Sequence, residues 1–132
     1  MADDHPNAVA YRRTADAFRA RDDALLKSLI ATDVVWHVPG SHPMAGDIRG
    51  RGALLDWLAN VRTKGFWLEE QDVFGNDRHV CAVSTMGARR DGVDVRTRVV
   101  SVFRYAQGQQ LERWFYPDDP AVWDTIFDDG GA

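Results

Sequence analysis

The segment that decides the fold reads DVVWHVPGSHPMAGDIRG and runs from Asp33 to Gly50. Its first part, about Val34–Val38, is rich in β-branched and aromatic residues, which predicts a short strand carrying Trp36 and His37. A proline–glycine pair ends this strand, and a loop rich in both residues leads to a helix that begins near Arg51. This order places an aromatic and a titratable side chain at a strand end, beside a loop that can cover a pocket.

The segments on either side of this strand have helical periodicity. Tyr11, Ala15 and Phe18 recur at i, i+4 and i+7, which predicts a helix from Ala8 to about Ala20. Asp22 can cap a second, shorter helix, and a third is expected over roughly 51–62. The residues expected to be buried on the second and third helices are Leu25, Leu26, Leu29, Ile30, Leu54, Trp57, Leu58 and Val61.

From residue 66 onward the pattern changes to strands separated by turn signals such as Asp91-Gly92. Asp119 then caps a short C-terminal helix with Pro120 at its first position. Helices followed by a meander of long strands indicate the α+β class. The predicted strands are Phe66–Phe74, His79–Ala88, Val93–Tyr105 and Gln110–Tyr116.

Length, charge and cysteine content narrow the class of protein. The 132 residues suit a single domain over 1–132, and 45% of them are hydrophobic. A net charge of −4 without a basic cluster argues against nucleic acid or an anionic membrane as a partner. The lone cysteine, Cys81, rules out an internal disulfide, and there is neither a signal peptide nor an apolar run of ~20 residues. We therefore expect a cytoplasmic protein.

Three stretches carry a resemblance to a known family: WHVPGSHPMAG followed by Arg49-Gly50, the hairpin FRYAQGQQLERWFY, and the tail DDPAVWDTIF. Over about Ala8–Phe127 the chain resembles the SnoaL-like members of the cone-fold family that includes nuclear transport factor 2 and the ketosteroid isomerases. The resemblance implies an NTF2-like cone, in which a curved mixed or antiparallel sheet wraps around three N-terminal helices and a short C-terminal helix follows. Because this fold hosts both enzymes and binding proteins, it does not define the function.

His37 is the first candidate for a catalytic base. Gly40–Pro43 resembles the Gly-Ser-x-Pro of the ketosteroid isomerases, and counting back without a gap puts His37 where they carry their aspartate base. Counting forward from Asp33 puts Val38 there instead. In a strand, a shift of one residue moves a side chain to the opposite face of the sheet. A histidine with a reference pKa of ~6.5 suits proton abstraction beside a carbonyl. The alternative is that Trp36 points inward and His37 makes an outer hydrogen bond.

Other candidates would stabilise a developing oxyanion. The resemblance implies a tyrosine on the first helix, where this chain offers Tyr11 or Thr14, and an acid on the long strand, where it has Ser101. Losing such a donor lowers the rate a hundredfold or more, so steroid isomerase activity is not expected. The E-x-W-D pattern of the SnoaL-like cyclases is kept in Glu112-Arg113-Trp114, but Phe115 replaces the acid.

Arg113 shares a face with Phe115 by strand alternation. If that face lines the cavity, Arg113 can bind a carboxylate or an enolate. The alternative is a salt bridge at a dimer interface. Arg96 and Arg98 occur on the long strand without the Asp–Arg–Asp set that the limonene epoxide hydrolases of this fold use, so that hydrolysis is not expected.

The aromatic residues are numerous enough to line an apolar cavity, which favours a planar hydrophobic molecule over a sugar or a nucleotide. No HxH or HxxxH spacing and no glycine-rich phosphate loop occurs, so neither a metal nor another cofactor is expected. The residues expected to contact the ligand are Trp36, Val38, His42, Trp57, Phe66, Phe103 and Phe115.

Two functions follow from these residues. The first is a SnoaL-like protein that binds a hydrophobic, carbonyl-bearing or polycyclic ligand and acts as a cofactor-free acid/base isomerase or polyketide-cyclase-type enzyme, with His37 as base and Tyr11, Ser101 or Arg113 stabilising the oxyanion. The second is a non-catalytic ligand-binding or dimerisation module of the same fold. In both, a homodimer is expected through the outer sheet face, with Val100, Val102, Trp114 and Tyr116.

Overall fold

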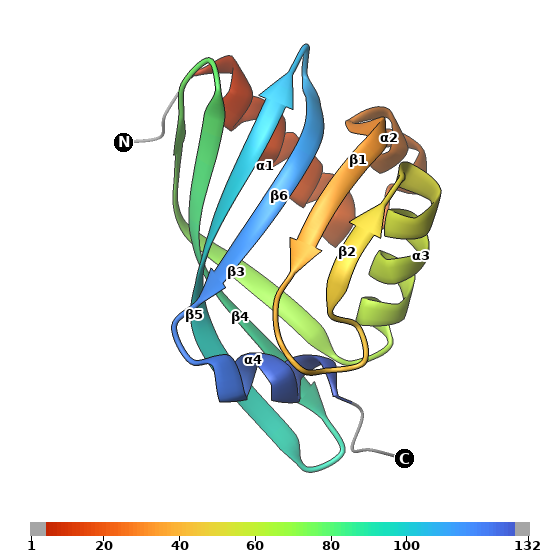
Figure 1. Cartoon of the computed structure of the whole chain (residues 1–132), viewed down its shortest axis with the longest axis vertical. Helices are drawn as coiled ribbons and strands as arrows, with labels where there is room; N and C mark the ends of the chain where they lie inside the picture. The colour runs from red at the N-terminus through yellow and green to blue at the C-terminus, as the bar shows by residue number, and fades with distance from the viewer. Residues whose placement is uncertain (1–4, 129–132) are drawn as a thin grey trace.

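The structure, a computed structural model, describes residues 5–128. Two helices and two strands are followed by a third helix, four long strands and a fourth helix (Figure 1). Their bounds are α1 Pro6–Arg19, α2 Asp23–Ser28, β1 Ile30–Val38, β2 Gly46–Arg49, α3 Arg51–Arg62, β3 Phe66–Gly75, β4 His79–Arg90, β5 Val93–Ala106, β6 Gln109–Pro117 and α4 Pro120–Phe127.

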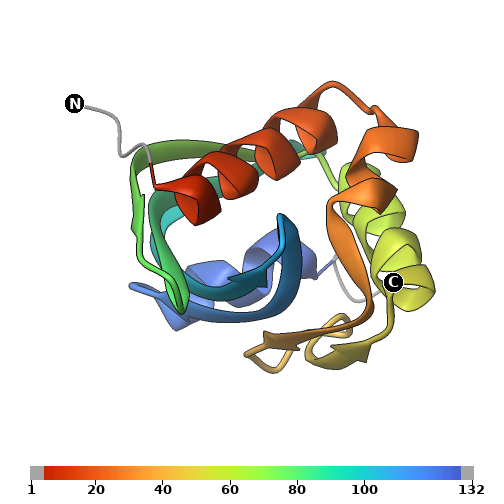
Figure 2. The ribbon, with the colours of Figure 1, turned by 90° about the horizontal axis from the view of Figure 1, so that it is seen from above.

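The strands form a six-stranded sheet in the order β2-β1-β6-β5-β4-β3. β1 and β6 run parallel, and all other neighbouring strands are antiparallel. Figure 2 shows the sheet curling so that α1 lies across its hollow side, while α3 packs beside β1 and β2. The predicted α+β cone, with a curved mixed sheet around the helices, is confirmed.

The helix starts follow from capping residues. Asp22 accepts a hydrogen bond from the backbone N–H of Leu25, and Asp119 caps α4 through its side chain, as predicted. α1 begins at Pro6, two residues before the predicted start at Ala8, because proline suits the first helical turn. Within residues 5–128 no helix combines the length and hydrophobicity needed to cross a bilayer.

Two predictions at the start of the sheet need correction. β1 begins at Ile30 rather than Val34, since the chain passes from the end of α2 directly into the sheet. Gly46–Arg49, expected to be part of the loop, forms the edge strand β2 beside β1. This strand has four residues, with Ile48 as its one aliphatic side chain, so it carries no alternating pattern that sequence analysis could detect.

Buried apolar side chains pack in two clusters. The larger one joins the sheet to α2, α3 and α4 and includes Trp36, Leu54 and Trp123. The smaller one lies under α1, where the rings of Tyr11 and Phe103 are 4.6 Å apart. Residues of both clusters line the cavity described below.

The turn from α3 into β3 sets the position of Phe66, which lines that cavity. Gly65 in this turn has φ +71°, and a Cβ there would lie 1.9 Å from the carbonyl oxygen of Arg89. We therefore expect Gly65→Ala to lower the free energy of unfolding by at least about 2 kcal/mol in urea denaturation. The matched control is Gly52→Ala on α3, where a Cβ meets nothing within 4 Å; it should stabilise by about 0.5–1 kcal/mol. Equal stability of the two variants would contradict this account of the turn.

Candidate functional site

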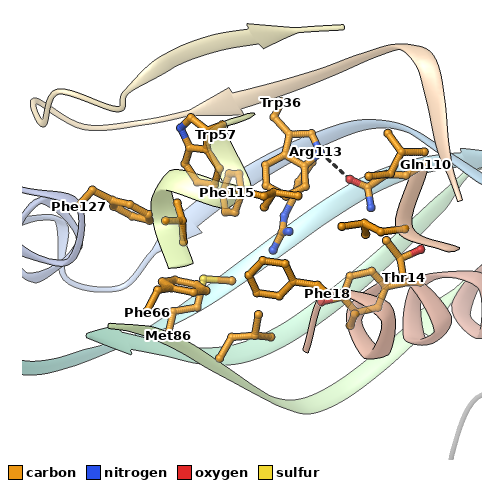
Figure 3. Close-up of a pocket in the computed structure, with 17 residues that line it drawn as sticks. Thr14, Phe18, Trp36, Trp57, Phe66, Met86, Gln110, Arg113, Phe115 and Phe127 are labelled. Carbon is orange, nitrogen blue, oxygen red and sulfur yellow. Dashed lines mark hydrogen bonds between the residues drawn. The ribbon is translucent and has the colours of Figure 1, made fainter. Parts of the chain in front are cut away.

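A cavity lies between α1, α3 and the hollow side of the sheet (Figure 3). Its volume is about 50 Å³ and its walls are predominantly apolar. Side chains from α1, α3, α4 and several strands meet there, so residues far apart in the sequence share one space. The aromatic residues that line it are Tyr11, Phe18, Trp36, Trp57, Phe66, Phe115 and Phe127.

The register of β1 determines whether Trp36 or His37 faces the cavity, which the sequence alone left open. Trp36 is buried and lines the cavity, with its ring centroid 5.4 Å from that of Phe115 and 5.7 Å from that of Trp57. His37 is the next residue, so its side chain leaves the opposite face of the sheet. The expectation that His37 takes a proton from a ligand in this cavity therefore needs correction, because it does not line it.

His37 instead joins three strands on the outer face. Its Nδ1 lies 2.9 Å from Asp47 on β2, its Nε2 lies 2.6 Å from Glu112 on β6, and its ring stacks on Trp114. The hydrogen bond to Glu112 has the largest effect and raises the pKa of His37; burial opposes it, and the hydrogen bond to Asp47 adds to the rise. Because both ring nitrogens face carboxylates, the imidazolium form donates to both strands and ties β2 to the sheet.

Arg113 is the charged group of the cavity. Its side chain comes from β6, is 6% exposed, and reaches between the aromatic rings (Figure 3). The guanidinium carbon lies 4.1 Å from the ring centroid of Phe115, 4.5 Å from that of Phe103 and 4.6 Å from that of Trp36. Burial lowers the pKa of Arg113, but an arginine side chain stays protonated in proteins.

Most other polar groups around the cavity are joined in one directed chain of hydrogen bonds. Trp36 Nε1 donates to Gln110 Oε1, and Gln110 Nε2 donates to the Tyr105 hydroxyl. Tyr105 in turn donates to Thr14, whose hydroxyl donates to the carbonyl of Ala10. The indole N–H of Trp36 is used inside the protein, which fixes the orientation of its ring.

Tyr11 pairs with a carboxylate at the edge of the cavity. Its hydroxyl donates to Glu70 Oε2 over 3.1 Å, and the other oxygen of Glu70 accepts from Arg19. A β-bulge follows Glu70 in β3, and such irregularities redirect side chains. Burial raises the pKa of the Tyr11 hydroxyl, so this group is a neutral hydrogen-bond donor at physiological pH.

The other predicted residues divide into two groups. Trp57 and Phe66 line the cavity with the residues already described. Ser101 and Phe103 lie behind Arg113 instead: the Ser101 hydroxyl accepts a hydrogen bond of 3.0 Å from Nη2 of Arg113. They contact the guanidinium rather than the open space, so any role of theirs in binding is to position Arg113.

Val38 and His42 do not line the cavity, in contrast to the expectation for them. Val38 belongs to the larger apolar cluster. His42 is buried in the loop after β1, where its ring stacks on Phe127, its Nε2 donates to the carbonyl of Pro39 and its Nδ1 accepts from the backbone N–H of Met44. Burial lowers the pKa of His42, and the neutral ring holds the loop in shape.

Glu70 and Gln110 are polar residues of this region that were not among the candidates expected from the sequence. Glu70 lies on the same face of β3 as Phe66 and Leu68, so strand alternation could have placed it beside the cavity. Gln110 could not be placed in this way, because a register shift next to it puts Gln110 and Arg113 on one face although they are three residues apart. No group of three or more His, Cys, Asp or Glu side chains within residues 5–128 is arranged to hold a metal ion.

Comparison with known proteins identifies the family. Residues 11–113 match the model of the SnoaL-like domain. The chain belongs to the SnoaL-like family. The uncharacterised protein Rv0034 of Mycobacterium tuberculosis is 30% identical to it over 120 residues, which cover 88% of this chain and 92% of that protein. The recognition made from the sequence is therefore confirmed.

Solved structures confirm the fold. Bal32a, from a soil-derived mobile gene cassette, superimposes with a TM-score of 0.86 at 25% identity, covering 92% of this chain and 96% of that one. An NTF2-like protein from Burkholderia xenovorans superimposes with a TM-score of 0.75 at 19% identity, covering 93% of this chain and 96% of that one. Rv0760c from Mycobacterium tuberculosis, solved in complex with estradiol-17beta-hemisuccinate, gives 0.72 at 18% identity, covering 84% and 92%.

The His37 contacts predict a pH-dependent stability. The raised pKa of His37 adds stability below its unfolded value of ~6.5, and this is lost as pH rises through the folded pKa. The lowered pKa values of Glu112 and Asp47 add stability above ~4, which is lost as pH falls. His37→Gln should therefore lower the thermal midpoint more at about pH 5.5 than at about pH 8.5, while exposed His79→Gln should not. A loss that is the same at both pH values would contradict the pairing.

Proposed function

We propose that this SnoaL-like protein binds a small, planar, hydrophobic ligand that carries a carbonyl group, with its rings against the aromatic walls of the cavity. The observation that carries the proposal is the cavity itself, in which Trp36 and Phe115 flank the only guanidinium lining it among residues 5–128, and Trp57 packs against Trp36. Sites of this kind combine apolar walls with a few convergent polar groups. Arg113 would bind the carbonyl oxygen, and the rings would provide most of the contact area.

A ring-sized ligand requires the walls to move. The cavity of about 50 Å³ is smaller than the engineered cavity of about 150 Å³ that is known to accept benzene in another protein. Phe18 and Phe66 are only partly buried, in contrast to Trp36, so they are the side chains able to turn outward. Trp57 is also partly buried, but its indole N–H donates to the carbonyl of Met44. Trp36 is fixed through its bond to Gln110 and would form the rigid wall.

Binding is favoured over catalysis by the residues that line the cavity. The described lining has no carboxylate and no histidine, so it lacks an obvious proton acceptor for acid/base chemistry. The second candidate, a cofactor-free isomerase or polyketide-cyclase-type enzyme, is favoured by Arg113 and Tyr11. Both residues line the cavity, so an oxyanion bound there would meet the guanidinium and, if the bond to Glu70 were exchanged, the Tyr11 hydroxyl.

The solved relatives support a ligand of this size for the fold. Rv0760c was crystallised in complex with a steroid derivative, estradiol-17beta-hemisuccinate. At 18% identity this similarity shows a shared fold only. That the present chain also binds a polycyclic ligand is therefore part of our proposal. A cytoplasmic location, which the single cysteine favours, is also part of the proposal.

Filling the cavity tests the proposal. Ala15 lines it from α1, and leucine there would occupy the space that a ligand needs. We expect 2-acetylnaphthalene to bind the unchanged protein saturably in calorimetry and Ala15→Leu to weaken that binding at least about tenfold. The control is Ala59→Leu, an exposed position on α3. Equal affinity of Ala15→Leu and the unchanged protein, or no saturable binding at all, would contradict the proposal.

We also propose a homodimer through the outer face of the sheet. Tyr116 is 57% exposed and opposite Val100 in the register, and Trp114 is opposite Val102, which makes a continuous apolar strip across β5 and β6. Light scattering should give about twice the 14.8 kDa of one chain, and Tyr116→Lys should shift the mass toward a single chain. A monomer in the unchanged protein would contradict this arrangement.

A further inference from the structure

We infer that the ligand of this cavity is a monoanion: a flat, largely apolar molecule whose carboxylate or enolate accepts hydrogen bonds from the guanidinium of Arg113. This inference rests on the proposed function and adds the charge of the ligand.

Arg113 carries a buried charge that the described part of the protein does not neutralise. No carboxylate within residues 5–128 lies at ion-pair distance from it, although buried charges in proteins are normally paired. The three aromatic rings around it stabilise a cation through their faces. They accept no conventional hydrogen bond from the in-plane N–H groups, so these groups still require an acceptor.

The donors of Arg113 are mostly unused. A guanidinium has five N–H donors. Among the described contacts Nη2 donates to Ser101, whereas Nε is buried without a partner. A carboxylate or an enolate bound at this edge would supply both the acceptors and the missing negative charge, and planar oxyanions match the geometry of arginine. A neutral carbonyl would supply an acceptor but leave the charge uncompensated.

The neutral polar groups offer a ligand fewer donors than Arg113 does. The indole N–H of Trp36 and one of the two amide N–H groups of Gln110 are used within the directed chain, and Tyr11 donates to Glu70. A ligand therefore finds most of the available donors, and the only positive charge lining the cavity within residues 5–128, at the guanidinium. Recognition in this cavity consequently depends on one cation rather than on a set of neutral hydrogen bonds.

The single cation of the cavity limits the ligand to a single negative charge. Glu70, beside Tyr11, is held by that hydroxyl and by Arg19 and is not an ion-pair partner of Arg113. A second negative group would lie among apolar walls, because no other cationic side chain within residues 5–128 lines the cavity. The site therefore suits a monoanion and disfavours a dianion.

Three naphthalene probes of similar shape test the inference on the unchanged protein by calorimetry: 2-naphthoate, neutral 2-acetylnaphthalene and 2,6-naphthalenedicarboxylate. We expect 2-naphthoate to bind at least about tenfold more tightly than each of the other two, because only it supplies one charge. Equal binding of 2-naphthoate and 2-acetylnaphthalene would overturn the inference and leave the proposed function standing. Binding of none of the probes would overturn the proposed function and this inference with it.

Two variants test whether the preference for 2-naphthoate over 2-acetylnaphthalene arises from Arg113. Arg113→Met should remove the preference for 2-naphthoate over 2-acetylnaphthalene, and Arg98→Met, at an exposed arginine of β5, should keep it. Replacing an uncompensated buried charge by an apolar side chain should leave the thermal midpoint of Arg113→Met at or above that of the unchanged protein. A retained preference in folded Arg113→Met, or its loss in Arg98→Met, would overturn the inference.

Discussion

A guanidinium held between the rings of Trp36, Phe103 and Phe115 is the interaction on which this cavity depends. Arginine tolerates such surroundings because it is delocalised and weakly hydrated. The arrangement is energetically incomplete, since the stacking leaves in-plane donors without acceptors. The neighbouring chain from Trp36 to Ala10 gives each of its hydroxyl and indole donors an acceptor. The positive charge of Arg113 is the group that the described residues leave without a counter-ion, which is why an anionic ligand is proposed.

The two faces of β1 and β6 separate this chemistry from the stability of the sheet. On the hollow side, Trp36 and Arg113 are register partners and meet at the cavity. On the outer side, His37 and Trp114 are register partners and stack, with carboxylates at both ring nitrogens. A shift of the register by one residue would move each set of side chains to the opposite face of the sheet. The parallel pairing of β1 with β6 therefore determines which residues a ligand can reach.

Much of this architecture could be predicted from the sequence, and the exceptions have physical causes. The caps at Asp22 and Asp119 act over three residues, so local sequence is sufficient to place them. The choice between Trp36 and His37 required the pairing of β1 with a strand about 75 positions away, which no local pattern contains. The inward position of Gln110 depends on a register shift in β6, and alternation fails at such a shift.

The most direct test of Arg113 as the anchor for an anion is a crystal structure of the protein soaked with 2-naphthoate. We expect the carboxylate to lie within about 2.7–3.0 Å of the guanidinium nitrogens of Arg113, Nε included, with the rings against Trp36 and Phe115. This role of Arg113 would be contradicted by a naphthoate bound in the reverse direction with its carboxylate in solvent. It would equally be contradicted by Glu70 turning inward to form the ion pair with Arg113 itself, because the protein would then supply its own anion.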